Sequence, residues 1–183
     1  MIKKLWIAVI AIGITGAVTA QDVKFGAKIG MNVSTITGDD VSNVDSKTGF
    51  VLGATAEIFF TDKFSVQPEL LFSQQGAKSE GNITVDLNYL TLPIMAKYYV
   101  AKGFSVEAGP QFSFLVKDEA IFEDNTTVDT NAKNFDLMAN LGLGYQLENG
   151  IFFQTRYNLG LLSIADDTDN KNGVFQIALG YQF

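Results

Sequence analysis

The chain has 183 residues, of which 47% are hydrophobic, and a formal net charge of −7. It contains no Cys and no His, which excludes thiol nucleophiles, Ser–His dyads, disulfides and nearly all zinc, copper or haem ligation. The acidic balance argues against nucleic acid as a partner, because binding to phosphates requires a basic surface.

The first 20 residues have the pattern of a secretory signal peptide. Lys3 and Lys4 form a basic start, residues 5–18 are apolar, and Val18-Thr19-Ala20 supplies the small residues of a cleavage site. An uncleaved membrane anchor is the alternative, but this apolar run is shorter than the roughly 20 residues that a spanning helix needs. We therefore predict a cleaved signal peptide at 1–20 and a single domain at 21–183, exported beyond the inner membrane of a bacterium.

The rest of the chain alternates between apolar and polar residues with a period of two, which is typical of β-strands with one apolar face. The pattern is clearest in residues 89–115, where two strands flank the short connection Ala101-Lys102-Gly103. Eight strands are predicted, at residues 24–33, 48–60, 64–75, from within 84–88 to 100, 104–115, 134–147, 151–161 and 173–183. Long and short connections alternate, so an antiparallel meander places the short turns and both termini at one end and the long polar loops at the other.

Two architectures fit an eight-stranded meander. In a soluble, periplasmic lipocalin-like barrel the apolar face lines a cavity for a small apolar ligand, whereas in an outer-membrane barrel it faces lipid and the polar face fills the lumen. The apolar faces carry no charge, large aromatics gather near strand ends, and a narrow barrel could not enclose so many Phe and Leu side chains. We therefore predict an all-β, eight-stranded antiparallel up-and-down transmembrane β-barrel in the outer membrane, with periplasmic termini and extracellular long loops.

The polar face also carries charges, four basic and four acidic. They are Lys24, Lys28, Glu57, Glu69, Lys97, Glu107, Asp136 and Arg156. An isolated charge inside a narrow barrel is costly, so we expect these residues to pair. We interpret them as a structural ion-pair network that fills the lumen and fixes strand register; a selectivity filter or a proton path is the alternative.

Three prolines, at positions 68, 93 and 110, fall inside predicted strands, which is unusual because proline lacks the N–H of a ladder bond. They belong to short motifs: QPELLF at 67–72 with Gly76, YLTLPI at 89–94 with KYY at 97–99, EAGPQ at 107–111, GLGY at 142–145 and RYNLGL at 156–161. Together these motifs resemble the PorT-like outer-membrane β-barrel domain family of Bacteroidetes-type bacteria. The resemblance implies that the prolines are family features of the strands, and it implies a link to secretion through the founding member of that family.

The last strand ends in Tyr181-Gln182-Phe183. Tyr181 and Phe183 resemble the C-terminal aromatic signal that the barrel-insertion machinery reads. We therefore expect that machinery to be one partner of the chain, alongside the lipid and lipopolysaccharide of the outer membrane.

Neither catalysis nor metal binding is supported by a motif. Small barrels that modify lipid A generally use Ser with His, and His is absent. The acidic loop at 166–173 departs from the calcium-loop pattern, because Lys171 occupies a ligand position and no Glu closes the loop. We therefore expect a non-enzymatic protein without a cofactor. Its role would be structural or interaction-based, including assistance in secretion, and would use the long loops at 34–47 and 117–133.

Overall fold

The computed structural model describes residues 22–38, 44–79, 83–122, 126–128, 132–164 and 170–183. The predicted signal peptide lies outside these residues. No helix in the described segments is long and apolar enough to cross a membrane. The strands are β1 (Val23–Thr37), β2 (Val44–Thr61), β3 (Phe64–Ser79), β4 (Ile83–Ala101), β5 (Phe104–Ile121), β6 (Thr127–Val128), β7 (Phe135–Gln146), β8 (Ile151–Gly160) and β9 (Lys171–Gln182).

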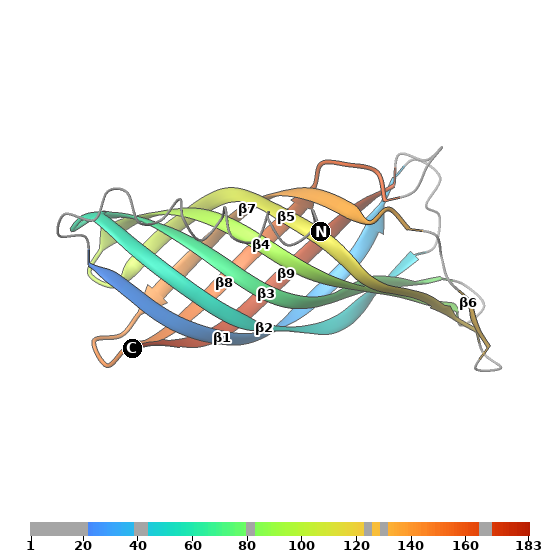
Figure 1. Ribbon diagram of the computed structural model, residues 1–183, viewed down its shortest axis with the longest axis horizontal. Coiled ribbons are helices and arrows are strands. Elements are labelled where there is room, and N and C mark those ends of the chain that lie inside the picture. The colour runs from blue at the N-terminus through green and yellow to red at the C-terminus, as the bar shows by residue number, and fades with distance from the viewer. Residues whose placement is uncertain (1–21, 39–43, 80–82, 123–125, 129–131, 165–169) are drawn as a thin grey trace, which may run out of the picture.

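Eight of these strands form a closed antiparallel barrel, which confirms the predicted fold (Figure 1). Each barrel strand pairs with the strands that precede and follow it, and β1 closes the ring on β9 from Gly26↔Gln182 to Thr37↔Lys171. The two-residue strand β6 pairs only with the end of β5. Closure gives every barrel strand a paired neighbour on both sides and leaves no open sheet edge, as a membrane requires.

The strands are longer at the long-loop end than the sequence pattern predicts. The β4–β5 ladder continues through Asp86↔Glu119 to Thr84↔Ile121, whereas alternation of apolar residues predicts an end of strand five at residue 115. The prediction was wrong here because the outward face turns polar, so periodicity no longer distinguishes strand from loop. The short strand β6, inside the predicted loop 117–133, gave no sequence signal for the same reason.

The apolar face of each strand points outward. Phe25 and Leu141 expose 62% and 64% of their surface, while the inward-facing Glu57 and Arg156 expose 0% and 2%. A soluble barrel would have the opposite arrangement, with charges outside and apolar side chains inside. The alternative of a lipocalin-like carrier of an apolar ligand is therefore wrong.

The three prolines lie inside the barrel strands, beside interruptions in three ladders. Pairing of β2 with β3 passes from Thr55↔Glu69 to Ile58↔Val66, skipping Pro68. Pairing of β3 with β4 passes from Pro68↔Ile94 directly to Leu71↔Thr91. Pairing of β4 with β5 passes from Pro93↔Gln111 to Ala96↔Ala108, skipping Pro110. The missing proline N–H groups thus fall where the ladder is already interrupted, which explains how these strands tolerate them.

Candidate functional site in the barrel lumen

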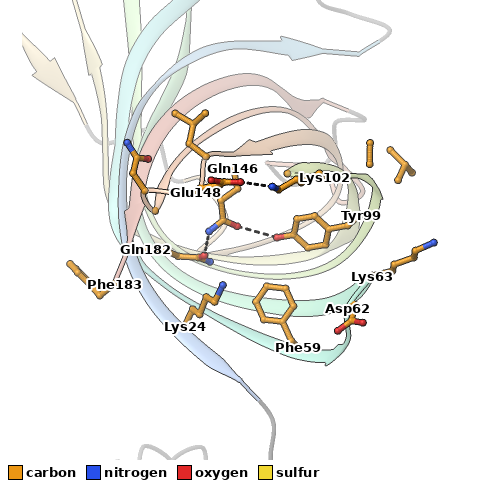
Figure 2. A pocket seen from close by; sticks show the side chains of 16 residues that line it. Lys24, Phe59, Asp62, Lys63, Tyr99, Lys102, Gln146, Glu148, Gln182 and Phe183 are labelled. Atoms are coloured by element: carbon orange, nitrogen blue, oxygen red, sulfur yellow. Dashed lines mark hydrogen bonds and ion pairs between the residues drawn. The ribbon is translucent and has the colours of Figure 1, made fainter.

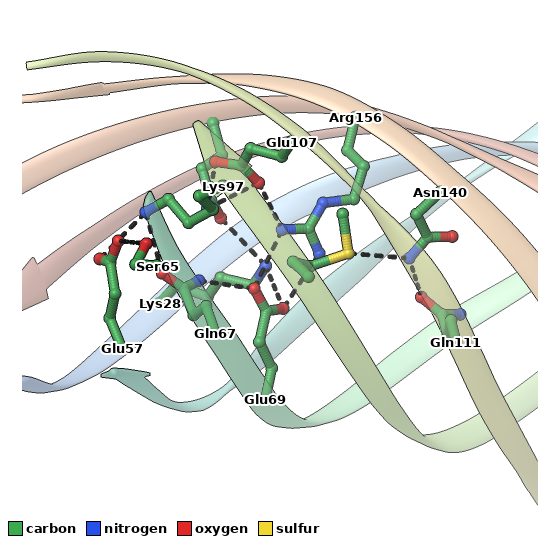
Figure 3. Close-up of polar contacts among 12 residues, drawn as sticks. Lys28, Glu57, Ser65, Gln67, Glu69, Lys97, Glu107, Gln111, Asn140 and Arg156 are labelled. Carbon is green, nitrogen blue, oxygen red and sulfur yellow. Dashed lines mark hydrogen bonds and ion pairs between the residues drawn. The ribbon is translucent and has the colours of Figure 1, made fainter. Parts of the chain in front are cut away.

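Arg156 on β8 is the centre of a buried ion network that crosses the lumen (Figure 3). Its Nη1 and Nη2 donate to the two carboxylate oxygens of Glu69 on β3 at 3.0 and 2.9 Å, and Nη2 also donates to Glu107 on β5 at 2.9 Å. Lys28 on β1 places its Nζ 2.7 Å from Glu69 Oε2. Gln154 donates to both oxygens of Glu107 at 3.0 and 3.2 Å. Two cations and two carboxylates from four strands are therefore joined by charge-assisted hydrogen bonds.

A second ion pair lies next to this network, toward the short turns. Lys97 Nζ is 3.0 Å from Glu57 Oε2 and also donates to Gln67 at 3.0 Å. Gln67 in turn donates to Glu69 at 2.7 Å, which links the two groups. Glu57 accepts three further hydrogen bonds, at 2.5 to 2.7 Å, from Ser65, Tyr99 and Gln182. Each carboxylate of these two groups, Glu57, Glu69 and Glu107, therefore has several donors, as charge burial requires.

The structure brings six of the eight predicted residues into this lumen network: Lys28, Glu57, Glu69, Lys97, Glu107 and Arg156. Lys24 lies outside it. This residue is exposed near the short-turn end, where its Nζ lies 5.0 Å from the centroid of the Phe59 ring. The alternation correctly assigned Lys24 to a strand, but the strand position is too close to the barrel mouth for its side chain to be buried.

Asp136 is also outside the lumen network, although it is buried in the lumen. It accepts a hydrogen bond from Asn172 Nδ2 at 3.0 Å, and no ion pair joins it to any described residue. Along β7, Asp136 is six residues beyond Gly142, which is opposite Glu107. At about 3.3 Å per residue this separation is roughly 20 Å, too far for Asp136 to reach the network cations.

Amide side chains and methionines fill the lumen above the ion network. Asn32 Nδ2 donates to Ser73 at 2.9 Å, and Gln176 Nε2 donates to Asn32 Oδ1 at 3.0 Å. Met95 and Met138 have no exposed surface. The filled section therefore continues from the charged layer toward the long loops.

An apolar cluster closes the lumen at the long-loop end. Leu87 and Tyr89 of β4 pack with Ile164, from the connection between β8 and β9, and these three residues expose 1%, 0% and 8% of their surface. The Ile164 carbonyl accepts a hydrogen bond from the N–H of Lys133 at 2.8 Å, which ties two long connections together. Residues 85, 87 and 89 are apolar or aromatic and alternate with polar residues, which indicates one buried face of a strand. The sequence did not fix where the fourth strand begins within residues 84–88, so the cluster was not predicted.

The described part of the lumen offers no metal site. Among the described residues, no group of three or more acidic side chains is placed to hold a metal ion. Asp166, Asp167 and Asp169 of the acidic loop lie outside the described residues. Chemically, the described arrangement pairs buried cations with buried carboxylates across the lumen.

The aromatic residues at the C-terminus are at the opposite end from this apolar cluster. Tyr181 and Phe183 expose 48% and 77% of their surface, and their rings meet edge to face with centroids 5.6 Å apart. The Phe183 N–H donates to the carbonyl of Phe25 at 2.8 Å, which holds the chain end on β1. Both aromatic side chains of the C-terminal strand end are therefore exposed at the short-turn end.

A closed eight-stranded barrel with an apolar outer wall and a polar, filled interior defines a small integral outer-membrane β-barrel protein. Residues 11–166 match the model of the outer membrane protein beta-barrel domain family, and the chain belongs to this family. No protein of curated function matches it in sequence.

Solved structures of small outer-membrane barrels share the fold. The attachment invasion locus protein Ail of Yersinia pestis is 18% identical with a TM-score of 0.60, and the match covers 88% of this chain and 99% of Ail. Ail has also been solved with the heparin analogue sucrose octasulfate; that structure is 17% identical with a TM-score of 0.59, at the same coverage. Neisserial surface protein A is 8% identical with a TM-score of 0.63, covering 88% of this chain and 99% of that protein. At these identities the likeness shows the fold alone.

Proposed function

We propose that this protein is a plugged outer-membrane barrel that acts through contacts made by its long-loop end and neither conducts solutes nor catalyses a reaction. The observation that carries this proposal is the continuous filling of the lumen. Ion pairs, amide layers and the apolar cluster at Leu87, Tyr89 and Ile164 follow one another along the barrel axis. Eight strands enclose only enough space for packed side chains, so a filled lumen is the expected state of a non-conducting barrel.

The conductance of the purified, folded protein in a planar lipid bilayer tests this proposal. We expect no reproducible unitary steps, with a water-filled porin as the positive control. The variant L87A/I164A, which removes much of the apolar cluster, serves as a matched variant. Stable unitary conductance of the wild type would contradict the proposal. Conductance in the variant alone would show that the apolar cluster closes the lumen.

The proposed orientation places the short turns and both termini in the periplasm and the long loops at the cell surface. The C-terminal aromatic pair supports it, because the insertion machinery would read such a signal from the periplasm. An epitope inserted between Asp62 and Lys63 should be hidden in intact cells, and one inserted between residues 124 and 125 should bind antibody. The reverse labelling pattern would overturn the orientation.

The charge of the long-loop end favours a cationic contact. Segments 38–47, 76–88, 116–134 and 162–172 together contain 13 acidic and five basic residues, out of 20 acidic and 13 basic in the chain. An acidic surface repels a polyanion and attracts cationic groups, including divalent cations that bridge to lipopolysaccharide. Sucrose octasulfate, the polyanionic partner in one Ail structure, is therefore a poor model for the partner of this protein.

The PorT-like motifs support a more specific role, in which the protein assists secretion of surface proteins. A deletion strain provides the test, by comparison of its secreted proteins with those of the parent strain. Loss of specific secreted proteins, restored by the wild-type gene, would support the secretion role. An unchanged secreted fraction would leave the protein with a purely structural or adhesive role at the surface.

A further inference from the structure

A cavity of about 820 Å³ opens at the short-turn end of the barrel (Figure 2). We call it the short-turn mouth. Its lining comes from the three short turns and the ends of β1 and β9, and includes Lys24, Phe59, Tyr99, Leu147 and Phe183. This volume lies within the range of about 300–1,000 Å³ that is typical of small-molecule sites.

The short-turn mouth ends against a closed floor and does not continue as a channel. The rings of Phe59 and Tyr99 stack with centroids 5.9 Å apart and planes 25° apart. Behind them, Tyr99 and Gln182 both donate to Glu57, at 2.7 and 2.6 Å. Gln146 and Gln182 hydrogen-bond to each other across the floor. The floor groups are therefore bonded among themselves, and a ligand could enter without disturbing the lumen network.

Lys24 is the cation directed into this space. Figure 2 shows its ammonium between Gln182 and Phe59, while Lys63 points away from the cavity and Lys102 points to Glu148. No carboxylate among the described residues forms an ion pair with Lys24, and its one close contact is the Phe59 ring at 5.0 Å. An exposed cation–π contact contributes only about 0.5–1 kcal/mol, so the ammonium remains available to an anion.

The other lining residues determine the chemical character of the rest of the ligand. Phe59, Tyr99, Val100 and Leu147 offer ring and aliphatic surface beside the ammonium. The acidic side chains of the lining are those of Asp62 and Glu148, and Glu148 is paired with Lys102. A ligand with one negative charge on an apolar body matches this surface better than a polyanion, because a single ammonium points inward.

We propose that the short-turn mouth binds a small organic carboxylate, with the carboxylate on Lys24 and the apolar part against Phe59, Tyr99 and Leu147. Two sources share this chemistry: free aryl carboxylic acids and free alkyl carboxylic acids. The proposal concerns the opposite end of the barrel from the proposed surface contacts. Its outcome is therefore independent of the conductance test and of the orientation.

NMR titration of the folded protein in detergent micelles tests the proposal. The amide signals of Gly103 and Gly150 serve as local reporters, because both glycines line the cavity. The two probes are 4-phenylbutyrate and hexanoate, and the uncharged 4-phenylbutyramide is the control. We expect saturable shifts from at least one carboxylate and much weaker binding of the amide. The probe that binds more tightly identifies the source.

Two lysine variants separate a specific contact from general attraction by the rim. K24M should weaken carboxylate binding about tenfold, which corresponds to about 1.4 kcal/mol. K63M removes the same charge from a side chain that points away, and should change affinity less than about twofold. If K24M does not fold, as judged by heat modifiability on a gel, K24Q takes its place.

Three results would overturn the proposal. The first is the absence of saturable shifts from both carboxylates up to about 10 mM, a level that excludes even weak binding. The second is equal binding of the phenylbutyramide control. The third is equal loss of affinity in the Lys24 and Lys63 variants, which would show attraction by the whole rim and no site at Lys24.

Discussion

The two halves of the lumen are filled by different chemistry. Toward the short turns, charges from β1, β3, β5 and β8 meet in a network with bidentate geometry, such as the contact of Arg156 with Glu69. Toward the long loops, the apolar side chains of Leu87 and Tyr89 pack against Ile164. The first half is held by directional bonds between strands distant in sequence, whereas the second depends on loops folding over the barrel. Stability should therefore reside mostly in the short-turn half, and access to the lumen should be controlled mostly in the long-loop half.

Loss of Arg156 tests the charged half most severely. The variant R156A leaves the buried carboxylates of Glu69 and Glu107 without their main cation, and we expect a loss of about 3–5 kcal/mol in the free energy of unfolding. Denaturant unfolding in lipid vesicles, followed by the heat-modifiable gel shift, measures it. K102A breaks an exposed ion pair and serves as the control, with little expected change. An unfolding midpoint of R156A equal to that of K102A would contradict the structural role of the network.

Truncation of the apolar cluster should cost less. The variant L87A removes a side chain that is 1% exposed and leaves a cavity, with an expected loss of about 2–3 kcal/mol. L90A, on the lipid-facing side of the same strand with 41% exposure, is the matched control and should lose less. The comparison also has a second readout, since L87A should increase protease cleavage of the long loops while L90A should not.

Replacement by the amide should change the free energy of unfolding differently at two buried acids, one inside the network and one outside it. E107Q weakens the contacts of Glu107 with Arg156 and Gln154, and should destabilise the barrel by about 1–3 kcal/mol. D136N keeps an acceptor for Asn172 and removes a charge that has no described ion pair, so its effect should lie within about 1 kcal/mol of zero or be stabilising. Equal destabilisation of both variants would show that Asp136 has a cationic partner in the folded protein.

The smallest effect is expected at the acidic loops. Replacing Asp39, Asp40, Asp166 and Asp167 with Asn removes four negative charges from the long-loop end. Exposed charges contribute little to stability, so the unfolding midpoint should stay nearly constant. Binding of a lysine homopolymer by the purified protein should weaken, and the difference should vanish at high salt because screening removes the attraction. Unchanged binding at low salt would argue against the proposed cationic contact.

The barrel could be predicted from sequence because its wall is defined by local alternation. Each outward position, such as Ile29 or Leu141, is apolar for the same reason, contact with lipid, and this reason acts on single residues. The order of long and short connections then sets the topology without any knowledge of side-chain contacts.

The lumen contacts could not be predicted to the same detail. Glu69 and Arg156 are 87 residues apart, and their contact depends on the register between all the strands that separate them around the barrel. The sequence places Lys24 and Asp136 on the same face as Arg156, but it does not give their height along the axis. The tertiary contact of Ile164 with β4 was missed because loop residues carry no periodic signal.

The interrupted ladders around the prolines have a mechanical consequence. On β4, residues 92 and 93 lack ladder partners on β3, and the next two residues, 94 and 95, lack them on β5. Four consecutive residues of one strand are thus held laterally on one side only, at mid-height in the wall, whereas the seam between β1 and β9 is paired without a break from Gly26↔Gln182 to Thr37↔Lys171. This segment should therefore resist lateral force less well than the seam between β1 and β9. When single molecules are pulled, β4 should separate from β3 and β5 at this segment before β1 separates from β9.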